Sequence, residues 1–285
     1  MNIAVSSYSF SQAMRDGRMN MMSVIPMAKK LGYEGIEIVR GNQSDKEMRA
    51  LAQYLKTQSE DEGIPIIAYM VSADFIKNGV DFEVERLKKE VEIAALLGAP
   101  RMRHDSSAGV DAYGNKVTFE EALPVIAEGY RRVTEFAAGL GVKTMIENHG
   151  YFMQDSCRVD KLIDTVNHPN FGWLVDIGNF MCADEDPVSA VTVGAKKAVH
   201  AHAKDFHYKP AGAFTPANGW FPTRGGAKLR GAIIGHGVVD VPKCLSLFKQ
   251  NGYNGWLSVE FEGIEDCIKA LEEDILNLRT MLSQI

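Results

Sequence analysis

Four polar residues follow runs of apolar residues in the second half of the chain. They are Glu147 within MIENHG, Asp176 within LVDIGN, His202 within HAHAKDFH and Glu260 within LSVEFEG. A carboxylate at the end of an apolar run loses water when the chain folds, and this desolvation is costly unless another group compensates it. A divalent cation would compensate all four residues together, because it binds carboxylate oxygens and an imidazole nitrogen directly. The sequence therefore predicts a metal site at these four positions.

The donor set of this predicted site is rich in oxygen and has no sulfur. Such a set suits Mn²⁺ or Mg²⁺, with Co²⁺ or Zn²⁺ as alternatives, so we expect one divalent metal ion per chain. Each residue also has a structural alternative: a turn cap for Asp176, an ion pair for Glu147 or Glu260, and a core hydrogen bond for His202. The occurrence of all four at the ends of successive strands favours the metal.

The elements that would position these residues alternate regularly along the chain. Apolar runs of about five residues alternate with longer amphipathic segments, most of which close with glycine. We expect strands at 3–7, 35–39, 64–70, 101–104, 142–147, 171–176, 198–203 and 255–260. We expect helices at 20–31, 45–62, 82–97, 118–140, 159–166, 187–197, 241–250 and 265–282. Eight such units predict an α/β protein with a single (β/α)₈ TIM barrel over residues 1–285.

The expected strands are apolar without strict alternation, which is typical of parallel strands covered by helices. An open doubly wound sheet is the alternative fold, but neither GxGxxG nor GxxxxGK[ST] follows an early strand. No linker rich in Pro, Gly or Ser divides the chain. In a barrel, the carboxyl ends of the strands form the mouth where chemistry takes place, so the four residues should meet there.

These motifs resemble those of the xylose isomerase-like family of sugar isomerases and epimerases, which includes hydroxypyruvate isomerases, ketose 3-epimerases and inosose dehydratases. The resemblance covers nearly the whole chain and rests on ENH, DxGN, HxKD, the GxG of 235–237 and SVE. It implies a set of metal ligands: Glu147, Asp176, His202 and Glu260. In the ketose epimerase branch it also implies that the two glutamates are an acid/base pair on opposite faces of the substrate.

The chemistry that we expect is proton removal next to a carbonyl, which requires a base and an electrophile for the developing oxyanion. The metal would be the electrophile, and Glu147 and Glu260 would take and return the proton. We therefore expect an isomerase or epimerase that acts on a small ketose or polyol-derived ketone. The alternative in the same fold is a dehydratase that expels a β-hydroxyl after the same proton abstraction.

Two functions from other classes are disfavoured. A zinc-dependent, abasic-site endonuclease-like phosphodiesterase would need more histidines and a basic face, whereas the chain has 7 histidines and a net charge of −6. A non-catalytic sugar-binding protein would not need the complete ligand set.

Three polar residues near the predicted mouth are candidates for contact with the substrate. Asn179 takes a position where several relatives have a histidine, and it can hydrogen-bond a substrate oxygen but cannot carry a proton. His149 could orient a ligand or cap its loop. His104 ends the fourth strand, where it could contact substrate or make a structural hydrogen bond.

Glu37, late in the second strand, could bind a substrate hydroxyl or pair with Arg40. Residues 206–240 show no helix or strand pattern, and a loop this long is more often functional than inert. We expect it to be a lid, with Arg230 and Trp220 near the substrate. An oligomer contact is the alternative for the lid, and a dimer or tetramer would fit.

The composition limits the cellular context and the partners. The chain has 31 Lys and Arg against 37 Asp and Glu, and its basic residues are spread along the sequence, so we expect no nucleic acid partner. No apolar run approaches the roughly 20 residues needed to cross a bilayer. The four cysteines show no CxxC spacing, which suggests free thiols and a cytoplasmic protein. The expected partner is a small sugar or polyol.

Overall fold

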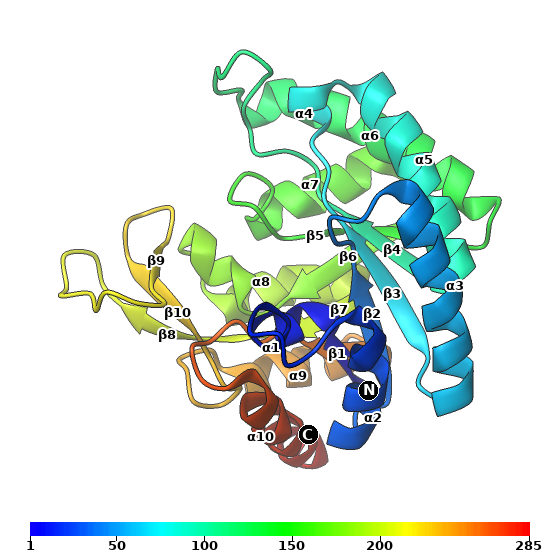
Figure 1. Cartoon of the computed structure of the whole chain (residues 1–285). Coiled ribbons are helices and arrows are strands. Elements are labelled where there is room, and N and C mark those ends of the chain that lie inside the picture. Colours follow the sequence, from blue (N-terminus) through cyan, green and yellow to red (C-terminus); the bar gives the residue numbers. More distant parts are fainter.

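A closed barrel of eight parallel strands forms the centre of the protein (Figure 1). The structure is a computed structural model that describes residues 1–285. Around the barrel the strands are ordered β1, β11, β7, β6, β5, β4, β3 and β2, and β2 pairs with β1 to close it. Their bounds are β1 Asn2–Ser6, β2 Gly35–Val39, β3 Ile66–Val71, β4 Arg101–His104, β5 Lys143–Glu147, β6 Phe171–Asp176, β7 Ala198–Ala203 and β11 Trp256–Val259. The predicted (β/α)₈ barrel is confirmed.

Helices cover the outside of the barrel (Figure 1). They are α1 Ser11–Arg15, α2 Val24–Leu31, α3 Asp45–Glu62, α4 Phe75–Asn78, α5 Val80–Leu97, α6 Phe119–Ala138, α7 Ser156–Val166, α8 Pro187–Gly194, α9 Val241–Gln250 and α10 Cys267–Ser283. Short 3₁₀ turns lie at Ser7–Phe10, Met21–Ser23, Asn179–Ala183 and Ala195–Lys197. Local sequence sets the ends: α3 begins with a capping box between Ser44 and Glu47 and ends at Gly63, whose φ is 70°. None of the helices has the length and apolar character that a membrane span requires.

Strand alternation decides which side chains enter the barrel, as β6 illustrates. Trp173 and Val175 belong to the large core between barrel and helices. Leu174 belongs to a separate apolar cluster with Ala68, Met70 and Met145. Because Asp176 lies two residues after Leu174, it faces the same way. The strand therefore aims this carboxylate into the mouth.

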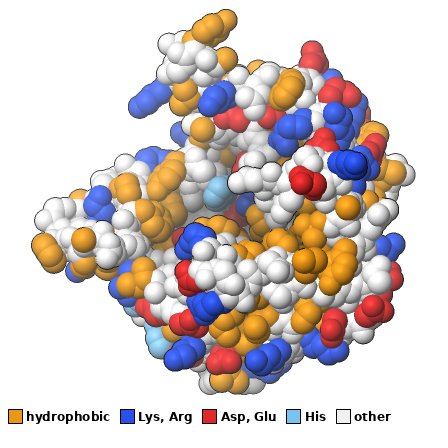
Figure 2. Space-filling model, in the orientation of Figure 1, with side chains coloured by type: hydrophobic (Ala, Val, Ile, Leu, Met, Phe, Trp, Pro, Cys, Tyr) orange, Lys and Arg blue, Asp and Glu red, His pale blue; other side chains and the backbone are white.

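The segment 206–240 differs from the expectation of an irregular loop. It contains most of a three-stranded antiparallel sheet in the order β8 Asp205–Lys209, β10 Lys228–Ala232 and β9 Phe221–Pro222. In Figures 1 and 2 this sheet forms an arm that projects from the barrel, with hydrophobic side chains along it. The sequence pattern missed it because β9 has two residues and β8 pairs with β10 across a long connection.

Candidate metal centre

The four predicted ligands meet at the mouth of the barrel. Glu147 ends β5, Asp176 ends β6, His202 lies on β7 and Glu260 follows β11. One ligand atom from each lies within 4.8 Å of the others. Glu147, Asp176 and His202 are buried, and Glu260 is half-buried at the cavity wall. The register of the sheet produces this meeting, since Asp176 is paired with His202 on the neighbouring strand.

His202 Nδ1 is the centre of the group. It lies 3.7 Å from Glu147 Oε1, 3.5 Å from Asp176 Oδ2 and 3.8 Å from Glu260 Oε2. Neither Nδ1 nor Asp176 Oδ2 has a hydrogen-bond partner, although both atoms are buried. Buried polar atoms without hydrogen-bond partners are rare in folded proteins, and these two face one another. This donor set fits a divalent cation, which would satisfy them together.

Two cations that sequence reasoning did not assign to the site contact the glutamates. Arg103 Nη2 lies 2.6 Å from Glu147 Oε2. Lys204 Nζ lies 2.5 Å from Glu260 Oε2 and 3.4 Å from Asp176 Oδ2. The two glutamates therefore have different partners: a guanidinium, which keeps its protons, and an ammonium, which can donate one.

Asn179 joins these groups. Its amide nitrogen donates to Glu147 Oε1 at 3.0 Å, and its amide oxygen accepts from Lys204 Nζ at 3.1 Å. Its backbone N–H donates to Asp176 Oδ1 at 2.9 Å. These contacts orient Glu147 and Asp176. Asn179 also lines a cavity beside the ligands, so contact with substrate stays a prediction.

The charges at the site shift its pKa values in opposite directions. Burial alone would raise the pKa of the Glu147 carboxyl, but the Arg103 guanidinium and the imidazoles of His202 and His149 together outweigh burial and hold that pKa well below its ordinary value. Burial alone would lower the pKa of His202, but the carboxylates of Glu37 and Glu260 hold it well above its ordinary value. A metal at His202 Nδ1 would therefore displace a proton, and its affinity would fall as the pH falls.

A cavity of about 240 Å³ opens over the ligands. Its polar lining includes Tyr8, Ser72, Arg103, His149, Lys204 and Glu260. Figure 2 shows a hollow between the barrel and the arm, with a histidine visible inside it. A larger groove of about 870 Å³ lies on residues 108–120, α7 and Arg224, and it contains none of the four ligands. We place the chemistry in the smaller cavity because the candidate ligand Glu260 and the two cations, Arg103 and Lys204, line it.

His149 lies at this cavity, as expected. Its Nδ1 is 2.9 Å from Asp105 Oδ1. Burial opposes the charged imidazole, but Asp105 raises the pKa of His149 above its ordinary value. Either a substrate contact or an orienting role stays a prediction for this residue.

The expected substrate contact of His104 does not fit its position. His104 is fully buried and stacks on Tyr130 of α6 at 4.2 Å, with its Nδ1 2.9 Å from the Asp105 carbonyl oxygen. Burial lowers its pKa to about 4. Neighbouring residues on a strand face opposite sides, so Arg103 enters the barrel and His104 faces the helices.

Glu37 also lies away from the cavity. It is fully buried, and its two carboxylate oxygens contact the imidazoles of His200 and His202. The alternative partner, Arg40, instead contacts Glu90 and Asp45. Sequence reasoning did not assign His200, although the HAH spacing places both histidines on one face of β7.

Arg230 and Trp220 lie on the arm. The Arg230 guanidinium stacks over the Trp220 ring at 5.5 Å and lies 3.5 Å from Glu265. Neither residue lines the cavity over the ligands, whereas Phe221 lines the adjoining cavity with Asn179. Their contact with substrate stays a prediction.

Two buried carboxylates anchor the loop after β10. Asp205 accepts from the backbone N–H groups of Gly235, Gly237 and Val239. Asp274 of α10 accepts from the Ile234 N–H at 2.7 Å through Oδ1, while its Oδ2 has no partner. Burial raises the pKa of Asp274 to about 7.

Asp274→Asn is expected to flatten the pH dependence of stability. An unfolded aspartate has a pKa of about 3.9, so the folded protein holds the extra proton between about pH 4 and 7, and stability falls as the pH rises through this window. Asparagine cannot ionise, so the variant should not show this pH-dependent decrease in the free energy of unfolding, which is on the order of a few kcal/mol in the wild type. Urea unfolding from pH 4 to 8 would measure this. Parallel profiles for the variant and the wild type would contradict it, and Glu272→Gln on the exposed face of α10 is the control.

Comparison with known proteins agrees with the barrel fold. The family model described as xylose isomerase-like TIM barrel matches residues 25–281. The rhizopine catabolism protein MocC of Rhizobium meliloti is 27% identical, over 82% of this chain and 72% of that protein. An inosose dehydratase of Clostridium botulinum is 22% identical, over 81% of this chain and 78% of that protein. The crystal structure of the IolI protein with a bound zinc atom aligns with a TM-score of 0.80 and 18% identity. The alignment covers 100% of this chain and 99% of that chain.

Proposed function

Because the chain belongs to the xylose isomerase-like TIM barrel family, we propose that it is a divalent-metal-dependent enzyme that removes a proton next to the carbonyl of a small ketose or polyol-derived ketone. The observation that carries this proposal is the convergence of four ligand atoms within 4.8 Å at the barrel mouth. The likeness to inosose dehydratases supports a sugar or polyol as the substrate class. Mn²⁺ or Mg²⁺ is our first expectation for the ion.

The proposed metal ligands are Glu147, Asp176, His202 and Glu260. A bound divalent ion would act as a Lewis acid toward the substrate oxygens and would stabilise negative charge on the carbonyl oxygen. Asp176 Oδ2 and His202 Nδ1, two buried atoms without a hydrogen-bond partner, support this assignment.

Glu260 is the better placed of the two glutamates to exchange a proton with substrate. It lines the cavity, and 11% of its side chain is exposed. Glu147 is 1% exposed, and Arg103 holds its pKa well below the ordinary value. We therefore assign the proton transfer first to Glu260, with Lys204 as its hydrogen-bonded neighbour, and an orienting role to Glu147.

Two reaction outcomes follow from the same proton removal. Return of the proton to carbon gives an isomerase or an epimerase, and loss of a β-hydroxyl gives a dehydratase. The unequal partners of the two glutamates favour the dehydratase, because an epimerase in which both glutamates exchange protons would need two comparably free carboxylates. The inosose dehydratases among the relatives favour it too.

The charges at the cavity favour an uncharged substrate. Each cation that lines it contacts a carboxylate: Arg40 contacts Glu90, Arg103 contacts Glu147, His149 contacts Asp105 and Lys204 contacts Glu260. A phosphate group would need a free cation or a nest of backbone N–H groups. We therefore expect unphosphorylated ketoses and inososes to be turned over, and their phosphate esters to react at least tenfold more slowly in kcat/KM. Faster turnover of the esters would contradict this expectation.

Product analysis tests the proposed function. The protein would be stripped with a chelator, reloaded separately with Mn²⁺, Mg²⁺, Co²⁺ or Zn²⁺, and incubated with a panel of ketoses and inososes. Loss of water in the product mass indicates a dehydratase, and an unchanged mass with a new sugar indicates an isomerase or epimerase. Equal activity with and without metal would refute the proposed function.

A further inference from the structure

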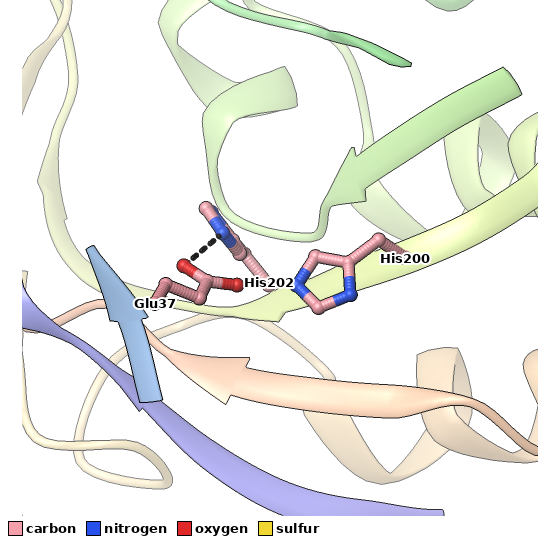
Figure 3. A group of neighbouring side chains, drawn as sticks. All are labelled: Glu37, His200 and His202. Carbon is pink, nitrogen blue, oxygen red and sulfur yellow. Dashed lines mark hydrogen bonds and ion pairs between the residues drawn. The ribbon is translucent and has the colours of Figure 1, made fainter. Parts of the chain in front are cut away.

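Beneath the ligand His202, a buried carboxylate joins two histidines. Figure 3 shows Glu37 reaching from β2 toward His200 and His202 on β7. The two histidines are two residues apart on one strand, so both side chains lie on the same face of β7, where both contact Glu37. All three side chains are 0% exposed.

The contacts of Glu37 are divided between the two imidazoles. Its Oε2 lies 3.1 Å from His202 Nε2, and its Oε1 is hydrogen-bonded to His200 Nε2. Ser258 Oγ lies 3.3 Å from the same nitrogen of His200. The carboxylate therefore bridges a histidine that is a candidate metal ligand and a histidine that is not.

This bridge determines where the protons lie. An ionised carboxylate only accepts hydrogen bonds, so His202 must donate through Nε2–H. In the neutral imidazole, the lone pair is then on Nδ1, the atom that faces Glu147, Asp176 and Glu260. A hydrogen bond to one ring nitrogen thus sets the tautomer that binds metal through the other.

We propose that Glu37 and His200 are positioning residues of the metal centre, which hold His202 in the tautomer and ring orientation that present Nδ1 to the metal. The proposal rests on the proposed function, because it requires a metal at the four ligands. Glu37 acts through His202, and His200 acts by fixing the second oxygen of Glu37.

The surroundings support a specific role for this trio. Ala68, which pairs with Glu37, and Leu174, which pairs with His200, belong to an apolar cluster with Met70 and Met145. A buried carboxylate with two histidines adds desolvation costs that an apolar layer avoids. Its placement against a ligand gives a physical reason for the chain to contain it.

A second metal ion at Glu37, His200 and His202 is the competing interpretation, since their ligand atoms also lie within 4.8 Å of one another. His202 would then have to bind metal through both ring nitrogens and lose both protons. The trio is also enclosed, and Glu37 is already hydrogen-bonded to both imidazoles. Hydrogen bonding is therefore the interpretation that the geometry favours.

Calorimetric titration of the metal-free full chain with Zn²⁺ and with Mn²⁺ tests the proposal. Glu37→Gln is expected to weaken binding by on the order of 10- to 100-fold. Glutamine has one acceptor oxygen and places an NH₂ group against the other imidazole, so one histidine must change tautomer. His200→Gln retains an N–H donor for Glu37 and should bind metal more tightly than His200→Leu. Glu83→Gln is the matched control, because Glu83 is 1% exposed but contacts Asn78 and Arg86 outside the site.

The outcomes separate this proposal from the proposed function. If the wild type binds no divalent metal, the proposed function fails and the proposal fails with it. If the wild type binds one ion and Glu37→Gln binds it equally well, only the proposal fails. Two ions per wild-type chain, or an equal loss in Glu83→Gln, would also overturn it.

A measurement on the wild type tests the proposal even if a variant does not fold. In the zinc-loaded protein, ¹⁵N NMR of the histidines should show His202 bound to zinc through Nδ1 and protonated at Nε2. A His202 resonance bound to zinc through Nε2 would overturn the proposal without reference to any variant.

Discussion

Asp176→Asn is expected to abolish both the stabilisation of the protein by divalent metal and its turnover. Asp176 Oδ1 accepts from the Asn179 N–H, so an asparagine can keep this contact. Its amide NH₂ would replace Oδ2, which has no hydrogen-bond partner and lies 3.5 Å from His202 Nδ1. An NH₂ group cannot bind a cation, so the affinity for the metal should fall more than 100-fold. This is a larger loss than the usual effect of removing a residue that only hydrogen-bonds to a metal ligand.

Thermal unfolding with and without metal measures this effect. A ligand at 100 times its Kd stabilises the folded state by about 2.7 kcal/mol, so the wild type should unfold at a clearly higher temperature with metal. The variant should show almost no shift. Asp61→Asn, on the exposed face of α3, should behave like the wild type. A full metal-induced shift in Asp176→Asn would remove this residue from the ligand set.

Glu260→Gln is expected to reduce kcat by roughly 10³- to 10⁴-fold while the fold is retained. Glutamine has nearly the same shape and can still offer an oxygen, but it cannot take a proton from substrate. It also cannot keep the ion pair with Lys204, which is 2.5 Å from Glu260 Oε2. KM should change much less than kcat, since the lost interaction is used mainly in the transition state.

Steady-state kinetics and circular dichroism of the same preparation separate loss of catalysis from loss of fold. Glu272→Gln makes the same change at an exposed position of α10 and should retain wild-type activity. A Glu260→Gln protein with wild-type kcat would refute the assignment of the proton transfer to Glu260.

The meeting of the four candidate ligands could be predicted, because it follows from two simple regularities. Alternating strands and helices predict a barrel, and the last residues of parallel strands meet at one mouth. Asp176 ends a six-residue buried strand, so its position at the mouth follows from where the apolar run stops. The same reasoning applies to Glu147, which ends β5.

The contacts around the candidate ligands could not be predicted. They depend on which side of its strand each side chain lies on and on distances across the barrel. A shift of one residue along β4 exchanges Arg103, which contacts Glu147, with His104, which packs on Tyr130. Glu37 reaches β7 although its strand pairs only with β1 and β3. Strand periodicity gives no information on such contacts across the interior.

Solvent exchange tests the central claim most directly, that the metal centre removes a proton next to a carbonyl. The metal-loaded protein would be incubated in D₂O with the ketose or inosose that it converts, and the product would be examined by NMR and mass spectrometry. We predict solvent deuterium at the carbon next to the carbonyl, and its absence when metal is removed. Conversion with complete retention of the original hydrogen at that carbon would contradict the account.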